Sequence, residues 1–407
     1  MPSEPSGESP PRLAIFGAPP TFVHPLHVGR PNIGDRERLM ARINGVLDRN
    51  WLTNGGPLLH EFEARVSREV GVKHCVAMAN GTVALEIAIR ALELSGEVIV
   101  PAFTFVATAH ALQWQQITPV FCDVDPETHN IDVRLVEELI TPRTTGIIGV
   151  HLWGRGCDVQ ALEAIADRHH LDLLFDAAHA FGCSVGGRMI GGFGRCEVFS
   201  FHATKFVHCG EGGAVVTNDD ALASRIRSMR NFGFAGYDSV DAVGTNGKMS
   251  ELSAAMGLTS LESSARFVAV NRANHERYAA RISRIPGLRL TTFNELERAN
   301  YQYVIVEVDR EAAGLSRDEL VRVLFAENVL ARRYFAPGCH RMEPYRMLFA
   351  NHPPRLPVTE SLSENLLALP TGTQLADGDI ERVCGILARA IDAAPMVRRM
   401  LTARRAA

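Results

Sequence analysis

Residues 197–219, EVFSFHATKFVHCGEGGAVVTND, contain two short apolar runs joined by a polar, glycine-rich connection. Each run has the length and composition of a buried β-strand. Further apolar runs lie N-terminal to them at 74–79, 97–103, 119–124, 146–153 and 171–180, with helical patterns between them, as at 81–94 and 159–170. Strands that are apolar on both faces and alternate with helices predict a largely parallel sheet covered by helices, the α/β class.

The connection between the two runs of 197–219 carries Lys205. It is one of only three lysines in the chain, with Lys73 and Lys248, although Lys and Arg together number 42. In a parallel sheet, functional groups gather beyond the carboxyl ends of the strands. A lysine placed there can form a Schiff base, which an arginine cannot, because its guanidinium stays protonated. Lys205 is therefore a candidate for covalent chemistry; the alternative is a surface lysine on a turn.

Length, charge and cysteine content set the broad class. A chain of 407 residues is long enough for two domains. The formal net charge of -4 gives no reason to expect a nucleic acid or a membrane as partner. The eight cysteines include no C-x-x-C pair, and no tight set of His and carboxylate residues suggests a metal site. We therefore expect a cytoplasmic protein without a metal.

The pattern along the chain predicts two domains and two unstructured ends. Residues 1–12 are rich in Pro, Ser and Glu, which favours a disordered lead-in. The alternating pattern places a large domain over 13–262, including an N-terminal segment. A long helical pattern at 250–282 leads into a smaller α+β domain over 263–398. The basic stretch 399–407 is expected to be a frayed tail.

Asp176 ends the apolar run LLFD, and His179 follows it by three residues. A carboxylate at the end of a strand can simply cap a helix. It can also be a buried partner for a cation, and an Asp that pairs with a pyridinium nitrogen is one such case. Asp176 and Lys205 lie at the ends of nearby predicted strands, so the pair points to a site more specifically than either residue alone.

Two further stretches are candidates for cofactor binding. In ANGTVALE (79–86), Gly81 and Thr82 open a predicted helix, whose free N–H groups suit a phosphate or need only an ordinary cap. In PAFTFVATAHAL (101–112), Phe105 follows a strand, where its ring could stack on a flat cofactor or belong to the core. The chain has neither a G-x-G-x-x-G after its first strand nor a G-x-x-x-x-G-K-[ST] motif, which disfavours a nicotinamide or a P-loop site.

Taken together, these motifs resemble those of the DegT/DnrJ/EryC1/StrS sugar aminotransferases. The resemblance covers nearly the whole chain, and its most specific stretches are PAFTFVATA (101–109), VHLWGRGCD (150–158), FDAAHAFGC (175–183), FSFHATK (199–205) and GEGGAVVTND (210–219). It implies a pyridoxal-phosphate enzyme of fold type I, similar to aspartate aminotransferase. Such a fold has a large domain with a mainly parallel seven-stranded sheet and a smaller α+β C-terminal domain.

The resemblance also implies roles around the cofactor ring. Lys205 would bind pyridoxal 5′-phosphate (PLP) covalently and act as a base, and Asp176 would keep the pyridine nitrogen protonated. His179 would lie near the ring oxygen, and Phe105 would stack on the ring. During a ping-pong transamination, the cofactor would cycle through pyridoxamine phosphate.

At the phosphate, the matching positions are Gly81, Thr82 and Ser200. Members of the family are homodimers with active sites at the subunit interface, and one phosphate contact comes from the other subunit. The usual position of that residue in GTNGKMSE (244–251) is occupied by Lys248, with Asn246 two residues earlier, so both remain candidates.

The motifs are most similar to a subgroup that aminates dTDP-4-keto-6-deoxy-D-glucose in antibiotic aminosugar biosynthesis, with L-glutamate as the expected donor. The candidate sugar-nucleotide contacts are Thr53, Asn54, Trp153, Phe232, Arg332 and Tyr334. A 3-keto sugar or a scyllo-inosose is the alternative substrate. A related branch with histidine in place of the lysine is disfavoured by Lys205, and a non-catalytic PLP-binding regulator is a further alternative.

Overall fold

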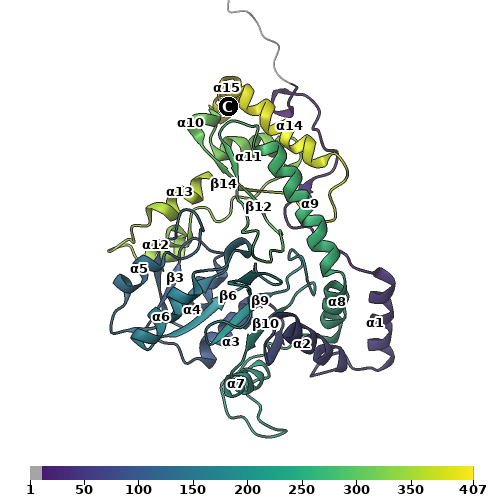
Figure 1. Cartoon of the computed structure of the whole chain (residues 1–407), viewed down its shortest axis with the longest axis vertical. Coiled ribbons are helices and arrows are strands. Elements are labelled where there is room, and N and C mark those ends of the chain that lie inside the picture. Colours follow the sequence, from purple (N-terminus) through teal and green to yellow (C-terminus); the bar gives the residue numbers. More distant parts are fainter. Residues whose placement is uncertain (1–11, 407) are drawn as a thin grey trace, which may run out of the picture.

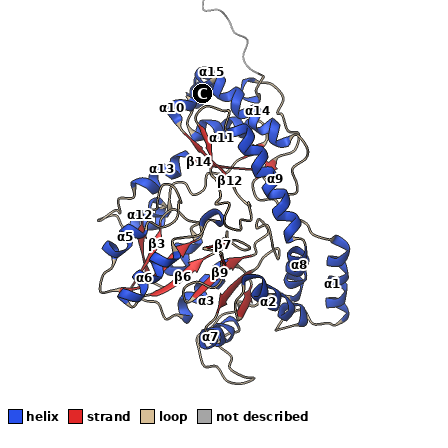
Figure 2. Ribbon diagram, in the orientation of Figure 1, coloured by secondary structure: helices blue, strands red, loops and turns tan. Residues whose placement is uncertain are grey.

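The computed structural model describes residues 12–406, which form two parts (Figures 1 and 2). The larger part is built on a seven-stranded sheet, and the smaller part lies at the end of the long helix α9 (Ser264–Ile282). All but one residue of the expected lead-in at 1–12 lies outside the described residues.

The large sheet has the strand order β2-β10-β9-β6-β5-β3-β4. Its strands are β2 (His74–Met78), β10 (Gly213–Thr217), β9 (Cys196–Ser200), β6 (Asp172–Asp176), β5 (Thr144–Val150), β3 (Glu97–Pro101) and β4 (Thr118–Cys122). Only β10 runs against its neighbours β2 and β9; the other pairs are parallel. This sheet, with its helical layers, confirms the predicted α/β class and the fold type I architecture.

The strands read as continuous apolar runs because helices cover both faces of the sheet. Val98 and Val100 of β3 pack into one helical layer, and Ile99 packs into the other. The first layer contains α3 (Gly81–Ala91), α4 (Ala107–Gln113) and α7 (Asp220–Arg230). The second layer contains α2 (Pro57–Val70), α6 (Val159–His169) and α8 (Glu251–Glu262), with the short α5 (Val133–Val136) beside them.

The helical pattern at 250–282 forms two helices instead of one. Helix α8 ends at Glu262, and α9 begins at Ser264. At the junction, the Ser263 N–H bonds the Ser260 carbonyl, three residues back, so the regular helical ladder is interrupted. Helix α1 (Arg36–Asp48) packs against α8 on the outside of the large part.

The small part is built on an antiparallel sheet of order β11-β12-β14. Its strands are β11 (Leu288–Leu290), β12 (Val304–Val308) and β14 (Leu366–Leu369), and its helices are α10 (Arg310–Ala313), α11 (Arg317–Ala326), α13 (Pro357–Asn365), α14 (Asp379–Asp392) and α15 (Ala394–Ala406). Two short elements connect to it, β13 (Val329–Leu330) and α12 (Glu343–Leu348), and a hairpin of β7 (Ser184–Val185) and β8 (Arg188–Met189) lies near the large sheet.

Both ends of the chain differ from the expectation. The segment from Leu13 packs into the core of the small part through Leu13, Ile15, Phe22 and Leu26, and β1 (Leu26–His27) pairs with β13. The assignment of this segment to the large domain was therefore wrong. The expected frayed tail begins inside α15, where Leu401 is buried against the same core. Sequence patterns missed both because the partners are distant in sequence.

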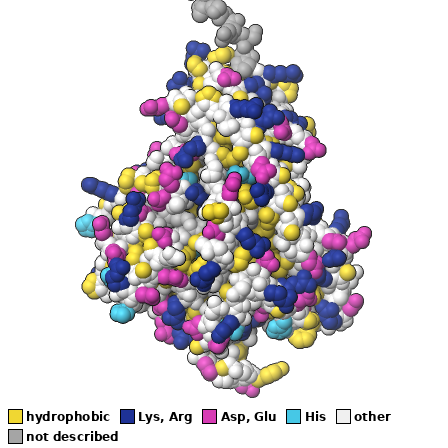
Figure 3. All heavy atoms as spheres, in the orientation of Figure 1, with side chains coloured by type: hydrophobic (Ala, Val, Ile, Leu, Met, Phe, Trp, Pro, Cys, Tyr) yellow, Lys and Arg dark blue, Asp and Glu magenta, His cyan; other side chains and the backbone are white. Residues whose placement is uncertain are grey.

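Figure 3 shows acidic and basic side chains interspersed over the visible face, in line with the small net charge. Among the described residues, no helix combines the length and the apolar character that crossing a membrane requires.

Candidate active site

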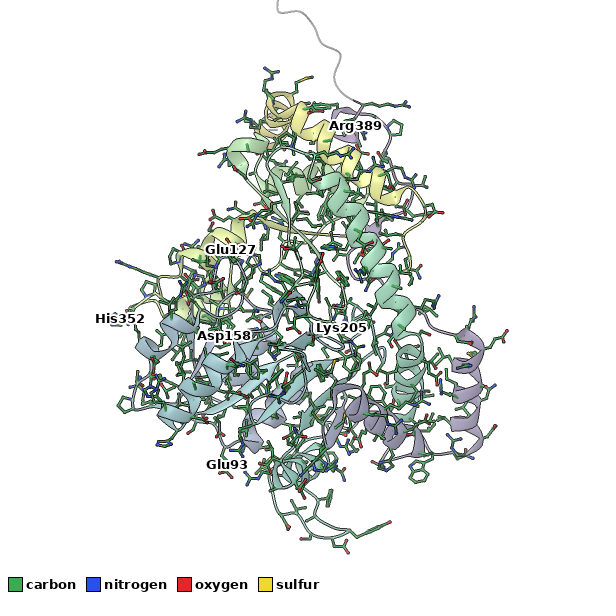
Figure 4. The ribbon with its side chains drawn as sticks, viewed as in Figure 1. Glu93, Glu127, Asp158, Lys205, His352 and Arg389 are labelled. Carbon is green, nitrogen blue, oxygen red and sulfur yellow. The ribbon has the colours of Figure 1, made fainter. Side chains whose placement is uncertain are left out.

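A cavity of about 600 Å³ opens between the carboxyl ends of the large-sheet strands and the small part. Figure 4 labels Lys205 in this region, between the sheet and the small part. The predicted site residues that line the cavity are Gly81, Thr82, Phe105, Asp176, His179, Ser200, Lys205, Arg332 and Tyr334. The sheet brings together groups that are more than 120 residues apart in sequence because the parallel strands end at one edge.

Lys205 lies in the loop that follows β9. Its Nζ donates a hydrogen bond to the hydroxyl oxygen of Tyr303 at 3.1 Å. Burial lowers the pKa of Lys205 to about 8, and the nearby Asp176 carboxylate opposes this shift. A lysine with such a pKa is partly neutral near physiological pH, which a nucleophile or a general base requires.

Asp176 ends β6 and is 5% exposed. Its carboxylate accepts a hydrogen bond from the Thr108 hydroxyl at 2.8 Å and one from the Ala178 N–H at 3.0 Å. Burial raises the pKa of Asp176, whereas these hydrogen bonds and the charge of Lys205 act in the opposite direction. A cation next to this carboxylate would favour its ionised form.

A second ionisable pair lies behind Asp176. The backbone N–H of His151 donates to the Asp176 carbonyl oxygen, and the His151 ring lies 3.3 Å from the Glu197 carboxylate, with both side chains fully buried. The backbone N–H of Cys157 donates to Nδ1 of His151 at 3.0 Å, so the ring proton lies on Nε2, which faces Glu197.

His179 forms part of an aromatic wall of the site. Its ring stacks on Trp153 with centroids 5.6 Å apart and lies 4.4 Å from the ring of Tyr303. Burial and the charge of Lys205 lower the pKa of His179 well below its usual value, so the ring is neutral. Its Nδ1 accepts the backbone N–H of Trp153 at 3.4 Å, which places the ring proton of His179 on Nε2.

The opposite end of the cavity is built by the N-terminus of α3. Asn80 caps the helix by accepting the Val83 N–H, and the N–H groups of the first turn have no intrahelical acceptor. A Cβ at Gly81 would come within 3.1 Å of the Ser200 Cβ, so glycine leaves room for close approach to the backbone. Phosphate oxygens suit such a helix end.

Some predicted residues do not line this cavity. Trp153 is fully buried behind it. The Lys248 ammonium lies 4.5 Å from the ring of Phe232 and donates to the Asn231 side chain. Asn246 forms a β-bridge with Asn231 in the same region. Thr53 and Asn54 lie in an exposed loop before α2. Within one copy of the chain, none of these residues except Trp153, which packs against His179 and Tyr303, is assembled around Lys205.

Sequence reasoning missed two residues that touch the candidate catalytic groups, the buried Thr108 and the cavity-lining Tyr303. Thr108, whose hydroxyl donates to the Asp176 carboxylate, lies three residues after Phe105 in the stretch 101–112. A hydroxyl residue one helical turn from a predicted site residue was the only sequence feature that could have indicated it. Tyr303 comes from the small part, 98 residues after Lys205, and has no local signal because the apolar run at 301–308 reads simply as a strand. Among residues 12–406, no group of three or more His, Cys, Asp or Glu side chains is placed to hold a metal ion.

Comparison with known proteins identifies the class of enzyme to which this fold and this site belong. The model of the DegT/DnrJ/EryC1/StrS aminotransferase family matches residues 34–388. The chain belongs to this family of sugar aminotransferases, which confirms the resemblance seen in the sequence motifs.

Individual relatives narrow the comparison. The crystal structure of DesI, determined in the presence of its TDP-sugar product, is 49% identical, has a TM-score of 0.91, and covers 97% of this chain and 99% of its own. The dTDP-4-amino-4,6-dideoxy-D-glucose transaminase of Escherichia coli is 33% identical over 89% of this chain and 98% of its own length. The GDP-perosamine synthase of Caulobacter vibrioides is 35% identical over 89% and 97%.

Proposed function

We propose that this chain binds PLP in the cavity around Lys205. The residues fit this cofactor at three points. Asp176 offers a buried carboxylate for a protonated ring nitrogen. The α3 N-terminus, with Gly81 and Ser200, offers a close-packed phosphate site. Lys205 lies in the same cavity with a pKa lowered to about 8. When bound, PLP supplies a ring that accepts electrons from a carbon undergoing deprotonation.

Residues of the chain would bind the cofactor, transfer the proton and hold the ring in place. Lys205 would bind the cofactor covalently, and its Nζ, once displaced by the amine of the donor, would take a proton from the donor's α-carbon. Asp176 would keep the ring nitrogen charged, and the Thr108 hydroxyl donates a hydrogen bond to its carboxylate. The neutral His179 has its proton on Nε2 and so can donate a hydrogen bond to the ring oxygen. Phe105, which is 56% exposed, would cover the face of the bound ring.

For the acceptor, we propose dTDP-4-keto-6-deoxy-D-glucose, aminated at C4 to dTDP-4-amino-4,6-dideoxy-D-glucose with L-glutamate as donor. The observation that carries this proposal is the 49% identity to DesI, a protein crystallised with a TDP-sugar product. Arg332 and Tyr334 line the same cavity from the side of the small part and are the proposed sugar-nucleotide contacts. Thr53, Asn54 and Phe232 remain further proposed contacts, whereas the fully buried Trp153 supports the wall behind the cavity. An antibiotic aminosugar is the proposed pathway product.

We also propose a homodimer. Neither Asn246 nor Lys248 lines the cavity of its own chain, as expected if one of them reaches the phosphate of a second copy. The loop that precedes them exposes apolar side chains, namely Phe232, Phe234, Tyr237, Val240 and Val243. In Figure 1, the segment after α7 projects from the body of the large part.

The test is amination of a panel of keto sugars by the purified protein with L-glutamate. The panel contains dTDP-4-keto-6-deoxy-D-glucose, its GDP-linked counterpart, a dTDP-linked 3-keto sugar and scyllo-inosose, and products are identified by mass spectrometry and NMR. We expect amination at C4 of the dTDP-linked 4-keto sugar. Preferential turnover of another member would overturn the substrate proposal alone. Lys205→Ala is the control: it should lose the visible band of the bound cofactor and the turnover, whereas Lys73→Ala should retain both.

A further inference from the structure

Lys205 has a hydrogen-bond partner that comes from the other part of the molecule. Tyr303 immediately precedes β12 of the small part, and its hydroxyl accepts the Lys205 Nζ hydrogen at 3.1 Å. The tyrosine is 8% exposed, and its ring packs edge-on against Trp153 with centroids 5.2 Å apart. The position of the hydroxyl is therefore fixed by packing and is not left to solvent.

Gln302 holds the backbone on both sides of Lys205. Its side-chain oxygen accepts the Phe206 N–H at 3.2 Å, and its side-chain nitrogen donates to the Thr204 carbonyl at 3.5 Å. The two residues next to Lys205 in sequence are thus both bound by one amide from the small part. This arrangement fixes the direction in which the lysine leaves its loop.

Asn300 makes a matching pair of contacts with the turn that carries His179. Its side-chain nitrogen donates to the His179 carbonyl at 2.9 Å and to the Phe181 carbonyl at 3.1 Å. The Asn300 carbonyl is in turn bound by Asn271 of α9. We call Asn300, Gln302 and Tyr303 the 300–303 clamp.

We propose that Tyr303 is a positioning residue for Lys205: its hydroxyl, held in place by the 300–303 clamp, fixes the amine in the cavity and makes its basicity depend on the docking of the small part. The inference rests on the proposed function only in that Lys205 is taken as the PLP-binding residue. The hydrogen bond between Lys205 and Tyr303 is made within one chain and involves no cofactor.

The direction of the effect follows from the geometry. An ammonium donates to Tyr303 more strongly than a neutral amine does, so this hydroxyl favours the protonated form of Lys205. Burial has the opposite effect, and Asp176 acts with Tyr303. The titratable and charged groups that share the cavity with Lys205 are Asp176, His179, His202, Glu211, Tyr303, Arg332 and Tyr334. Removal of the Tyr303 hydroxyl leaves all the others in place.

The test uses the fact that the chain has only three lysines. The full-length protein without added cofactor is labelled with lysine carrying ¹³C at Cε, whose NMR signals report protonation of Nζ. Arginine substitutions of Lys73 and Lys248 assign the signals. In Tyr303→Phe, we expect the Lys205 signal to titrate about one pH unit lower than in the wild type. Lys73, which is exposed beside Asp220, should not change.

Tyr301→Phe is the matched control. Tyr301 lies two residues away, and its ring packs against Phe293 at 4.7 Å and His275 at 5.5 Å, away from Lys205. An unchanged or higher titration point for Lys205 in Tyr303→Phe would overturn the proposal, as would an equal shift in Tyr301→Phe. Because this readout involves no cofactor, its failure is distinguishable from failure of the PLP proposal, which the visible band of Lys205→Ala tests.

Discussion

Asp176 lies in a place that solvent hardly reaches, so its ionisation depends on a few neighbours. The Thr108 hydroxyl donates to it at 2.8 Å, and the charge of Lys205 lowers its pKa. Since burial alone raises the pKa of this carboxyl, each neighbour that lowers the pKa helps to keep the carboxyl ionised. The protonation state of Asp176 therefore depends on side chains from two other stretches of the sequence, those of Thr108 and Lys205.

This dependence predicts how Thr108→Val should change the pH profile. The substitution removes a hydrogen bond to the charged carboxylate, so the pKa of Asp176 rises further. At a given acidic pH, more of the enzyme is then protonated at Asp176 and inactive. We expect the acidic limb of kcat/KM to move to higher pH by about one unit.

Thr217→Val is the control for this experiment, because its buried hydroxyl donates to the Arg195 carbonyl and not to the site. A shift of the same size in the control, or none in Thr108→Val, would contradict the assigned role of Thr108.

At the residue scale, the sequence was sufficient to predict cavity residues where a residue with a reactive or polar side chain ends or follows a strand. Asp176, Ser200 and Lys205 follow or end predicted strands, and the structure places all three at the cavity. Trp153 could not be placed from its position after β5: its left-handed backbone, with φ of 60°, turns it into the buried wall behind the cavity. The neighbours that tune the site, such as Tyr303, depend on the docking of a second domain and have no local pattern.

At the scale of elements, α2 has an unusual beginning. Its N-cap is Gly56, which has no side chain to accept a hydrogen bond. The fully buried Glu251, at the start of α8, takes the place of a cap. Its two carboxylate oxygens accept the backbone N–H groups of Leu58 and Leu59 at 3.0 and 2.8 Å. A Cβ at Gly56 would lie 2.3 Å from the Glu251 carboxyl carbon, which explains why glycine is used there.

Glu251→Ala should therefore be costly. It leaves two N–H groups at the helix start without their acceptor and opens a cavity, for which we expect a loss of about 2–4 kcal/mol in the free energy of unfolding. Urea unfolding followed by circular dichroism measures it. Asp35→Ala removes the exposed cap of α1 and should cost about 1 kcal/mol. Equal losses in the two variants would mean that Glu251 contributes no more than an ordinary surface cap.

The same region shows a limit of periodicity. The pattern at 250–282 is helical throughout, yet the helix is interrupted at Ser263. The serines in SLESS (260–264) were the only local indication, because Ser residues favour helix ends. Strand positions were easier to predict, since burial on both faces leaves an unmistakable apolar run.

At the scale of the whole molecule, the cavity of one chain lacks the cross-subunit group that the proposed dimer would supply. Asn246 and Lys248 lie in a segment beside the end of β2, and the Lys248 side chain turns toward Asn231 and Phe232 instead of the cavity. A site completed by a second copy predicts that two different defects can complement each other in one dimer.

Co-expression of Lys205→Ala with the double variant Asn246→Ala/Lys248→Ala tests this. Each variant alone should be nearly inactive. In a mixed dimer, one site carries both defects and the other carries neither, so random pairing should restore about a quarter of wild-type activity. Differently tagged subunits allow the mixed dimer to be isolated and assayed. Absence of recovery in the isolated mixed dimer would place the phosphate contact within one chain, and the single variants then distinguish Asn246 from Lys248.

The N-terminal segment has a consequence for how the protein is made. Ala14 and Thr21 donate their N–H groups to the buried carboxylate of Glu327, and Ala14 and Glu327 are 313 residues apart. At 5–20 residues per second, a ribosome needs about 15 to 60 s to cover that distance. The strands and helices of the large sheet leave the ribosome during this interval, while the first apolar residues of the chain still await their partners. Translation speed thus sets how long Leu13, Ile15 and Phe22 are exposed to chaperones before the small part can close over them.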